Sequence, residues 1–172
     1  PVGWFIDVEN ETYKVCSGWL FGANDCFAYK GFQLIKVTSP NGKEFYILNT
    51  HMDAGRRDSD RDAREKQLEH IVSVIKQKTE TKALIVAGDL NLNSKDPRDM
   101  SLLKKFKEEL SLIDTFKNTQ IVEKWSVLDY FLLIQGEDTK FKVNSVGEDK
   151  SFLTDEGPLS DHPALSIDLS IY

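Results

Sequence analysis

The feature that most constrains the fold is an uninterrupted apolar run, Ala83-Leu84-Ile85-Val86-Ala87, followed directly by Gly88-Asp89. A short run of this kind, without polar alternation, is typical of a β-strand that is covered on both faces. The rest of the chain must therefore supply neighbouring strands and a layer on each side. Its 172 residues give it the length of one domain with a single core.

Several further strands are predicted around this run. Residues 33–38 and 45–49 flank Asn41-Gly42, a pair that favours a tight hairpin turn, so we expect two antiparallel strands there. Additional strands are predicted from the apolar runs at 127–134, 141–146 and 164–171, the last with strict alternation.

Two amphipathic helices are predicted between the strands. The first has an S-x-x-D start signal at Ser59 and Asp62, and the second starts at Asp96-Pro97. Their apolar faces are Leu68, Ile71, Val72 and Ile75 in the first, and Leu102, Leu103, Phe106 and Leu110 in the second. Because strands and helices do not alternate strictly, the predicted class is α+β, with a mixed sheet or a pair of sheets flanked by helices, and not a doubly wound parallel sheet.

Composition excludes several classes of protein. With 40% hydrophobic and 29% charged residues, the chain is neither disordered, collagen-like nor a coiled coil. Its 22 basic and 28 acidic residues give a net charge of −6, which argues against a basic surface that holds nucleic acid by charge alone. A bound divalent cation would still allow such a protein to handle phosphates.

Targeting features are not apparent in the sequence. No apolar run reaches the roughly 18 residues of a spanning helix, and residues 1–7 lack the basic and long apolar regions of a signal peptide. Because the chain lacks an initiator Met, we expect Pro1 to mark a processing or trimming boundary.

Cys16 and Cys26 have no zinc-type spacing, and two alternatives remain open for them, a disulfide or two reduced core thiols. A secreted or extracytoplasmic location is expected, with a cytoplasmic one as the alternative.

Acids and imidazoles gather where the predicted strands end. Such positions are where functional sites collect. Taken alone, His51 has a structural interpretation as a loop histidine, and Asp89 one as a turn cap. Asp129 lies within an apolar strand, where a charge is costly unless it is paired, so it requires a partner. The set comprises His51, Asp89, Asn91, Asp129, Asp161 and His162.

The dipeptide Asp161-His162 joins an acid directly to an imidazole. Pro163 restricts His162 to an extended conformation, which tends to point the two side chains apart. The carboxylate can then face a metal while the imidazole faces a substrate, and Asp129 can fix the histidine tautomer. The third histidine, His70, is expected at the surface or at the rim of the core.

Four short motifs follow one another along the chain: Asn49-Thr50-His51, Gly88-Asp89-Leu90-Asn91, Leu128-Asp129-Tyr130 and Ser160-Asp161-His162-Pro163. With its motifs in this order, the chain resembles the endonuclease/exonuclease/phosphatase superfamily. Within the superfamily, the chain is most similar to bacterial sphingomyelinase-like members in the segments Asp25–Phe32, His51–Gly55 and Arg64–Leu68. The resemblance implies a deoxyribonuclease-like sandwich.

The resemblance also implies a reaction, the hydrolysis of a phosphate ester with Mg²⁺ or Mn²⁺. His162 would be the general base, and Asp129 would orient it. Asp89 and Asn91 would position water and a phosphate oxygen, and His51 would donate to the phosphate or the leaving oxygen. Asp161 and Asp89 would bind the metal, which suits their hard oxygen ligands.

One departure from the family pattern concerns the first half of the domain. The family's early Asn and its metal-binding Glu are not found, and Glu9-Asn10-Glu11 lie in a polar stretch without the expected strand. Residues 1–172 are therefore expected to form a single domain that is the C-terminal portion of a larger one, lacking its N-terminal strands. A companion N-terminal segment of the same protein is the expected partner.

Three functions follow from these expectations. The first is a metal-dependent phosphodiesterase acting on a phospholipid-type phosphodiester, with a lipid headgroup as partner and no transmembrane segment. The second is a nuclease of the same superfamily, which the negative charge makes the lesser choice. The third is an inactive half-domain that binds a partner through its incomplete sheet.

Other candidate ligand contacts have simpler interpretations. Lys30 and the pair Arg56-Arg57 are considered as phosphate binders, but the arginine pair lies among acids and is expected to be a solvated loop. Four aromatic residues are expected mainly in the core, with membrane contact as the alternative. These are Trp4, Trp19, Phe21 and Phe27.

Overall fold

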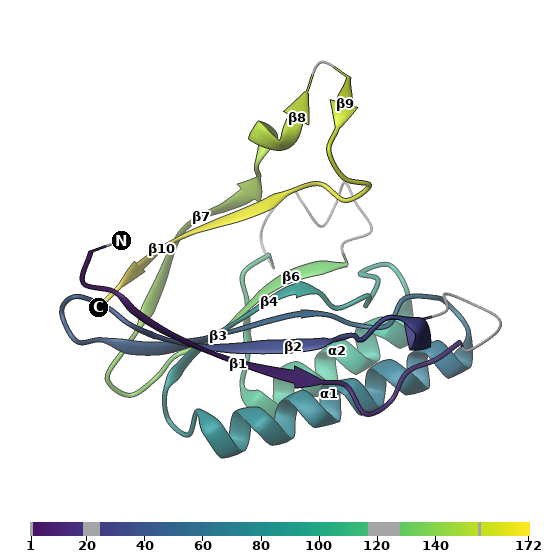
Figure 1. Ribbon diagram of the computed structural model, residues 1–172, viewed down its shortest axis with the longest axis horizontal. Helices are drawn as coiled ribbons and strands as arrows, with labels where there is room; N and C mark the ends of the chain where they lie inside the picture. The colour runs from purple at the N-terminus through teal and green to yellow at the C-terminus, as the bar shows by residue number, and fades with distance from the viewer. Residues whose placement is uncertain (1, 19–24, 117–127, 155) are drawn as a thin grey trace.

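The computed structural model describes residues 2–18, 25–116, 128–154 and 156–172. Its main element is a six-stranded mixed sheet with the strand order β1-β2-β3-β4-β6-β5 (Figure 1). The strands are β1 (Phe5–Thr12), β2 (Gly31–Thr38), β3 (Glu44–His51), β4 (Ala83–Asp89), β5 (Ile113–Asp114) and β6 (Asp129–Ile134). β3 and β4 are parallel, and the other neighbours are antiparallel.

The two faces of this sheet are covered differently. Helices α1 (Asp58–Lys78) and α2 (Pro97–Leu110) lie along one face, and the antiparallel pair β7 (Phe141–Glu148) and β10 (Leu165–Ile171) lies over the other (Figure 1). A small hairpin, β8 (Leu153–Thr154) with β9 (Gly157–Pro158), projects from that second layer, and two short 3₁₀ turns, η1 (Asp25–Phe27) and η2 (Lys150–Phe152), complete the elements. The predicted α+β sandwich with flanking helices is confirmed.

Strand β4 lies inside the sheet, as its apolar run predicts. It is bordered by β3 and β6, and Ala83, Leu84 and Val86 are fully buried. Leu84 and Val86 belong to the core under the helices, whereas Ala83 and Ile85 belong to the cluster under β7 and β10. Because side chains alternate along a strand, an all-apolar sequence is required where both faces are covered.

The predicted hairpin and helices form, with one correction. β2 and β3 pair through the Asn41-Gly42 turn, and Asp96 caps α2 by accepting a hydrogen bond from the Arg98 N–H at 2.9 Å. The predicted cap of α1 at Ser59 is wrong by two residues, since the cap is Arg57 and the helix begins at Asp58. The reason is that Asp60, and not Asp62, supplies the capping carboxylate, which accepts from the Arg57 N–H at 2.9 Å.

The interpretation of Glu9-Asn10-Glu11 as a stretch outside any strand is wrong. These residues belong to β1, which pairs with β2 and forms one edge of the sheet. On the face toward β7 and β10, Ile6 and Val8 remain 60% and 44% exposed. Their sequence neighbours are mostly polar because a strand at an edge is largely solvated, and this hides the strand from pattern analysis.

A buried polar network fixes the segment after β3. The guanidinium of Arg64 on α1 is fully buried and donates to the backbone carbonyls of Asp53, at 3.1 Å, and Gly55, at 3.0 Å. Its Nη2 lies 3.3 Å from Oδ1 of the equally buried Asp99 on α2. This network holds the loop that follows His51 against both helices.

The two cysteines form a disulfide, with their Cα atoms 5.2 Å apart. This decides between the two alternatives left open by the sequence. Among the described residues, neither helix is both long enough and apolar enough to span a bilayer.

The expected core position of the four aromatic residues holds only in part. Trp4 is half-buried and packs edge-on against Phe45, with ring centroids 6.5 Å apart. Phe27 is exposed, which corrects the core prediction: it belongs to η1, a short turn at the surface. Trp19 and Phe21 lie outside the described residues.

Candidate active site

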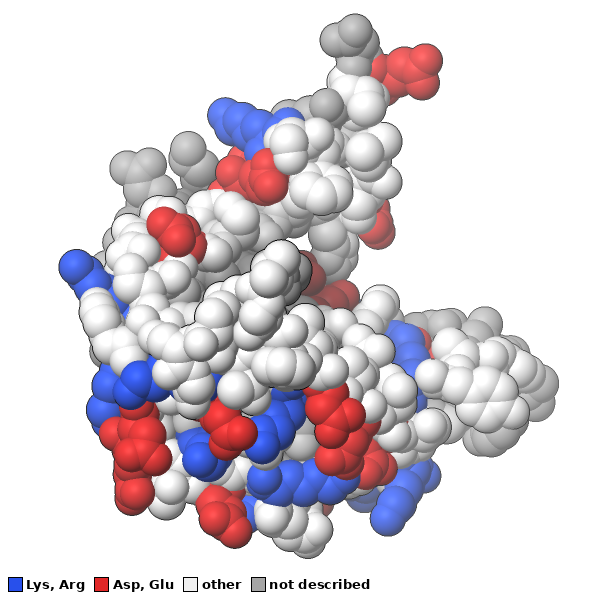
Figure 2. All heavy atoms as spheres, turned by 60° about the vertical axis from the view of Figure 1, so that its left-hand side comes forward, with Lys and Arg blue, Asp and Glu red and all other residues white. Residues whose placement is uncertain are grey.

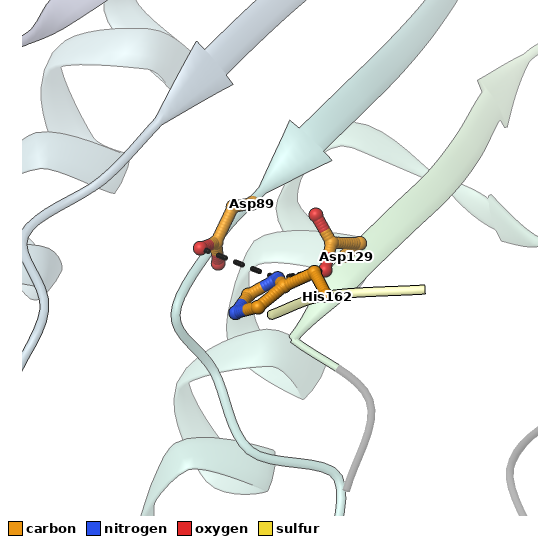
Figure 3. Close-up of side chains that lie close together, drawn as sticks. All are labelled: Asp89, Asp129 and His162. Carbon is orange, nitrogen blue, oxygen red and sulfur yellow. Dashed lines mark hydrogen bonds and ion pairs between the residues drawn. The ribbon is translucent and has the colours of Figure 1, made fainter. Parts of the chain in front are cut away.

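Three elements bring an imidazole and two carboxylates together. Asp89 ends β4 and Asp129 begins β6, and because these strands are antiparallel the two residues are direct register partners. The loop before β10 adds His162, whose Nδ1 lies 2.7 Å from Asp129 Oδ2 and 4.0 Å from Asp89 Oδ2 (Figure 3). The partner that Asp129 requires is therefore His162.

His51 joins the same site from the other side of β4. It ends β3, which is parallel to β4, and is in register with Asp89. Its Nε2 lies 3.5 Å from Asp89 Oδ2, and most of its side chain is exposed. Asp89 thus lies between two imidazoles.

Asn91 supports this arrangement through two hydrogen bonds. Its backbone N–H donates to Asp89 Oδ1 at 2.7 Å, and its side-chain Nδ2 donates to the carbonyl of Met52 at 3.0 Å. The residue has a φ of 51°, in the left-handed region that Asn tolerates better than most residues. Asn91 therefore links the end of β4 to the residue after His51.

Asp161 occupies a different position from the other acids. It is exposed, and the hydroxyl of Ser160 donates to its Oδ1 at 3.4 Å. Within the described part of the chain, the group whose potential ligand atoms lie within 4.8 Å of one another consists of Asp89, Asp129 and His162. Asp161 lies outside this compact group, although its charge reaches His162.

The electrostatics of Asp89 suit a site for a cation. Partial burial raises the pKa of its carboxyl above the ordinary range, and the nearby charge of Asp129 acts in the same direction. The Asn91 N–H and the two imidazoles oppose this rise without cancelling it. A divalent cation would relieve the repulsion between the two carboxylates.

The environment of His162 favours its protonated form. Partial burial of the imidazole opposes charging, but the hydrogen bond and charge of Asp129, with the charges of Asp89 and Asp161, outweigh it and raise the pKa above 6.5. With Asp129 ionised, Nδ1 carries the hydrogen of the 2.7 Å bond, which leaves Nε2 as the basic nitrogen.

Replacing Asp129 by Asn is expected to lower the pKa of His162, because it removes the charge of Asp129 and replaces a charged hydrogen-bond acceptor with a neutral amide oxygen. In the native chain the raised pKa contributes stability that is fully present below pH 6.5 and lost as the pH rises through the folded-state value. NMR titration of the histidine ring protons in the metal-free protein measures the shift, with His70 as internal reference. An unchanged or higher pKa would contradict this assignment.

Two cavities meet at the site. One of about 650 Å³ has His162 and Asp129 in its wall and extends over the apolar side chains of Phe131, Phe152 and Leu165. The other, of about 500 Å³, includes His51 and Asp89, and the two share Asn49 and Gly88. Figure 2 shows the surface hollowed between the projecting β8–β9 arm and the body of the molecule. A substrate placed in this hollow would reach both imidazoles.

The remaining candidates lie away from this hollow or are already engaged. Lys30 is held by Asp25 and the Met52 carbonyl, so its ammonium is not free for a phosphate. Arg56 is exposed, with Nη1 3.5 Å from Asp99 Oδ2, as expected of a loop of mixed charge. His70 lies at the rim of the core, its ring edge-on to Phe32 at a centroid distance of 5.3 Å.

The layered mixed sandwich, with polar groups at the ends of its central strands, is an architecture shared with a known family. The chain belongs to the Endonuclease/Exonuclease/phosphatase family 2, whose profile matches residues 6–143. The members named in that description act on phosphate esters, and this chain shares their ancestry.

Individual relatives are more distant. A sphingomyelinase from Mycobacterium tuberculosis is 24% identical over 170 residues, which cover 90% of this chain but 32% of the relative. An endonuclease/exonuclease/phosphatase from Bacteroides vulgatus has the same fold at 18% identity, with a TM-score of 0.71, covering 99% of this chain and 67% of its own. The chain thus spans about a third of the length of the sphingomyelinase.

A third similarity is to a structure solved with bound magnesium ions. A crystal structure of a variant of beta toxin from Staphylococcus aureus, with bound magnesium ions, has a TM-score of 0.55 at 18% identity and covers 94% of this chain and 62% of its own. At this identity the similarity concerns the fold alone. The acidic group formed by Asp89, Asp129 and His162 is nevertheless of the kind that holds a divalent ion.

Proposed function

We propose that the chain is the catalytic portion of a divalent-metal-dependent phosphodiester hydrolase. The observation that carries the proposal is the Asp129–His162 pair, with its 2.7 Å contact, placed beside Asp89 at the mouth of a cavity. A carboxylate-oriented imidazole is a general base suited to neutral pH. The carboxylate that orients it, Asp129, is itself fixed at the start of β6.

The proposed reaction is an attack by water on phosphorus. Nε2 of His162 takes a proton from the water as its oxygen bonds to phosphorus and the bond from phosphorus to the ester oxygen breaks. Asp129 stabilises the resulting imidazolium. Asn91 and Asp89 position the water and a phosphate oxygen, and His51 donates a hydrogen bond to the phosphate or gives a proton to the leaving oxygen.

The residues present fit a hard divalent cation. Asp89 and Asp129 offer carboxylate oxygens, and the pKa of Asp89 is raised mainly by partial burial and further by the neighbouring charge of Asp129. We propose that Asp89 holds Mg²⁺ or Mn²⁺ with Asp161 as a further ligand, which requires the 160–162 loop to turn its exposed carboxylate inward. Bound there, the ion neutralises charge on the phosphoryl oxygens.

The proposed substrate is a phospholipid-type phosphodiester, and a nucleic acid is the second candidate. The similarity to sphingomyelinases and the net charge of −6 both support a lipid headgroup. Release of phosphocholine from sphingomyelin vesicles with Mg²⁺, abolished by a chelator and restored by Mg²⁺ or Mn²⁺, is the expected result. Release of acid-soluble nucleotides from plasmid DNA without phosphocholine release would select the nuclease.

We further propose that residues 1–172 form the C-terminal portion of a larger domain. The exposed Ile6 and Val8 on the inner face of β1 support this, because an apolar sheet face of this kind is usually covered by a partner. Adding an N-terminal segment with a strand and a metal-binding Glu should raise metal affinity and activity. If neither changes, and the chain binds a partner without hydrolysis, the binding-module alternative is favoured.

The location we propose is secreted or extracytoplasmic. The Cys16–Cys26 disulfide supports it, because disulfides persist in oxidising compartments and are rare in the cytosol. Thiol labelling of the protein recovered from its native compartment tests this directly, since two reactive thiols would contradict the location.

A further inference from the structure

The geometry points to Asp25 and Lys30 as a positioning pair for His51. The pair lies outside the cluster of Asp89, Asp129 and His162, and it acts on the backbone directly after His51. This inference rests on the proposed function, because a positioning role requires that His51 take part in the reaction.

The pair grips this backbone at two points. Lys30 Nζ lies 2.6 Å from Asp25 Oδ1 and donates to the carbonyl of Met52 at 2.8 Å. The second carboxylate oxygen of Asp25 accepts from the Ala54 N–H at 2.7 Å. The carboxylate and the ammonium together therefore satisfy one acceptor and one donor in the three residues that follow His51.

The gripped carbonyl also belongs to the site. It accepts a second hydrogen bond from Asn91 Nδ2 at 3.0 Å, while the Met52 N–H donates to the carbonyl of Asp89 at 2.9 Å. The Met52 side chain is fully buried. The peptide groups on both sides of Met52 are thus fixed to Lys30, Asn91 and Asp89, which sets the direction in which His51 leaves the backbone.

Burial and charge indicate that this arrangement is more than a surface ion pair. The side chains of Asp25 and Lys30 are only 6% and 15% exposed. Groups buried to this degree lose hydration, so they persist where each finds charge-assisted hydrogen bonds, as both do here. Exposed ion pairs, by contrast, contribute little to position or stability.

The disulfide extends the same connection. Cys26 follows Asp25 directly, and Cys16 precedes Ser17, whose N–H donates to the buried carboxylate of Asp53 at 2.7 Å. Asp25 is therefore connected to residues 53–54 in two ways, directly through Ala54 and indirectly through the disulfide and Ser17. The disulfide thus helps to fix the position of Asp25 relative to this loop.

The test compares Lys30→Met, directly before β2, with Lys36→Met, a matched control within β2. Lys36 pairs with Glu44 at 2.8 Å on the surface. Amide hydrogen exchange of Met52 in the full chain is expected to become at least about tenfold faster in Lys30→Met and in Asp25→Asn, with Val86 and the Lys36→Met protein unchanged. Lys30→Arg, which keeps the charge and the donors, is expected to restore much of the protection.

Activity and a ring signal provide the second readout. In Lys30→Met, kcat on a soluble activated phosphodiester with Mg²⁺ is expected to fall about tenfold with little change in KM, because a displaced His51 affects the transition state more than binding. The NMR signal of the His51 ring should shift or broaden in this variant only. An unchanged Met52 amide and ring signal would overturn the inference, as would unchanged kcat in an active enzyme.

The two proposals fail in distinguishable ways. If the wild-type chain, alone and with an added N-terminal segment, hydrolyses no phosphodiester, the proposed function fails and His51 has no reaction to serve. If the wild-type protein hydrolyses a phosphodiester and Lys30→Met does so at the same rate, only the inferred positioning role of Asp25 and Lys30 is rejected.

Discussion

His162→Ala is expected to lower kcat for phosphodiester hydrolysis about a thousandfold, which is within the usual range for loss of a general base. The free energy of unfolding should change by no more than about 1 kcal/mol, because the side chain lies in a loop and is 34% exposed. Steady-state kinetics with Mg²⁺ and urea unfolding of the same preparation measure both quantities.

The matched control is the third histidine. His70→Ala removes an imidazole that lies at the rim of the core against Phe32, so kcat should stay near the wild-type value. The kcat of Asp129→Asn should lie between those of His162→Ala and His70→Ala, since this variant keeps the base but loses its orienting charge. A loss of several kcal/mol of stability in His162→Ala, or full activity in it, would show that His162 is structural.

Arg64→Met is expected to give the largest loss of stability, about 3–5 kcal/mol in the free energy of unfolding. The substitution leaves Asp99 buried with fewer partners and removes the donors to the carbonyls of Asp53 and Gly55. Urea or thermal unfolding, followed by circular dichroism, measures the change.

Two further variants decide whether burial is the cause. Arg98→Met removes an arginine that is 64% exposed and pairs with Asp58 at 3.1 Å, so it should cost at most about 1 kcal/mol. In the double variant Arg64→Met, Asp99→Leu both charges are absent, and part of the lost stability should return. Equal effects of Arg64→Met and Arg98→Met would contradict the assigned role of the buried pair.

Much of the sheet and of the site could be predicted because they follow local rules. The apolar run at 83–87 requires cover on both faces, and Asn41-Gly42 specifies a hairpin whatever surrounds it. Strand ends collect polar side chains, which is why Asp89 and His162 could be proposed as neighbours before any coordinates were known. The cost of a charge within an apolar strand similarly indicated that Asp129 would be paired.

The parts that escaped prediction depend on distant contacts. Arg64 and Asp99 resemble surface residues in the sequence, and only the packing of α1 against α2 buries them together. Asp25 and Lys30 give no periodic signal in the sequence. Their role depends on a contact with the Met52 carbonyl, which lies after the end of a distant strand, β3. Long-range pairing of this kind is invisible to patterns of a few residues.

The charge on the edge strand β1 affects whether copies of the protein can pair through the edges of their sheets. Asp7, Glu9 and Glu11 lie on one face of this strand, and Ile6 and Val8 lie on the other. If two copies met edge to edge with their faces aligned, carboxylates would come beside carboxylates, and like charges across a strand pair repel. Lys78 of α1 pairs with Glu9 and Glu11. Three carboxylates still exceed this one lysine, so the strand discourages fibre-like self-association.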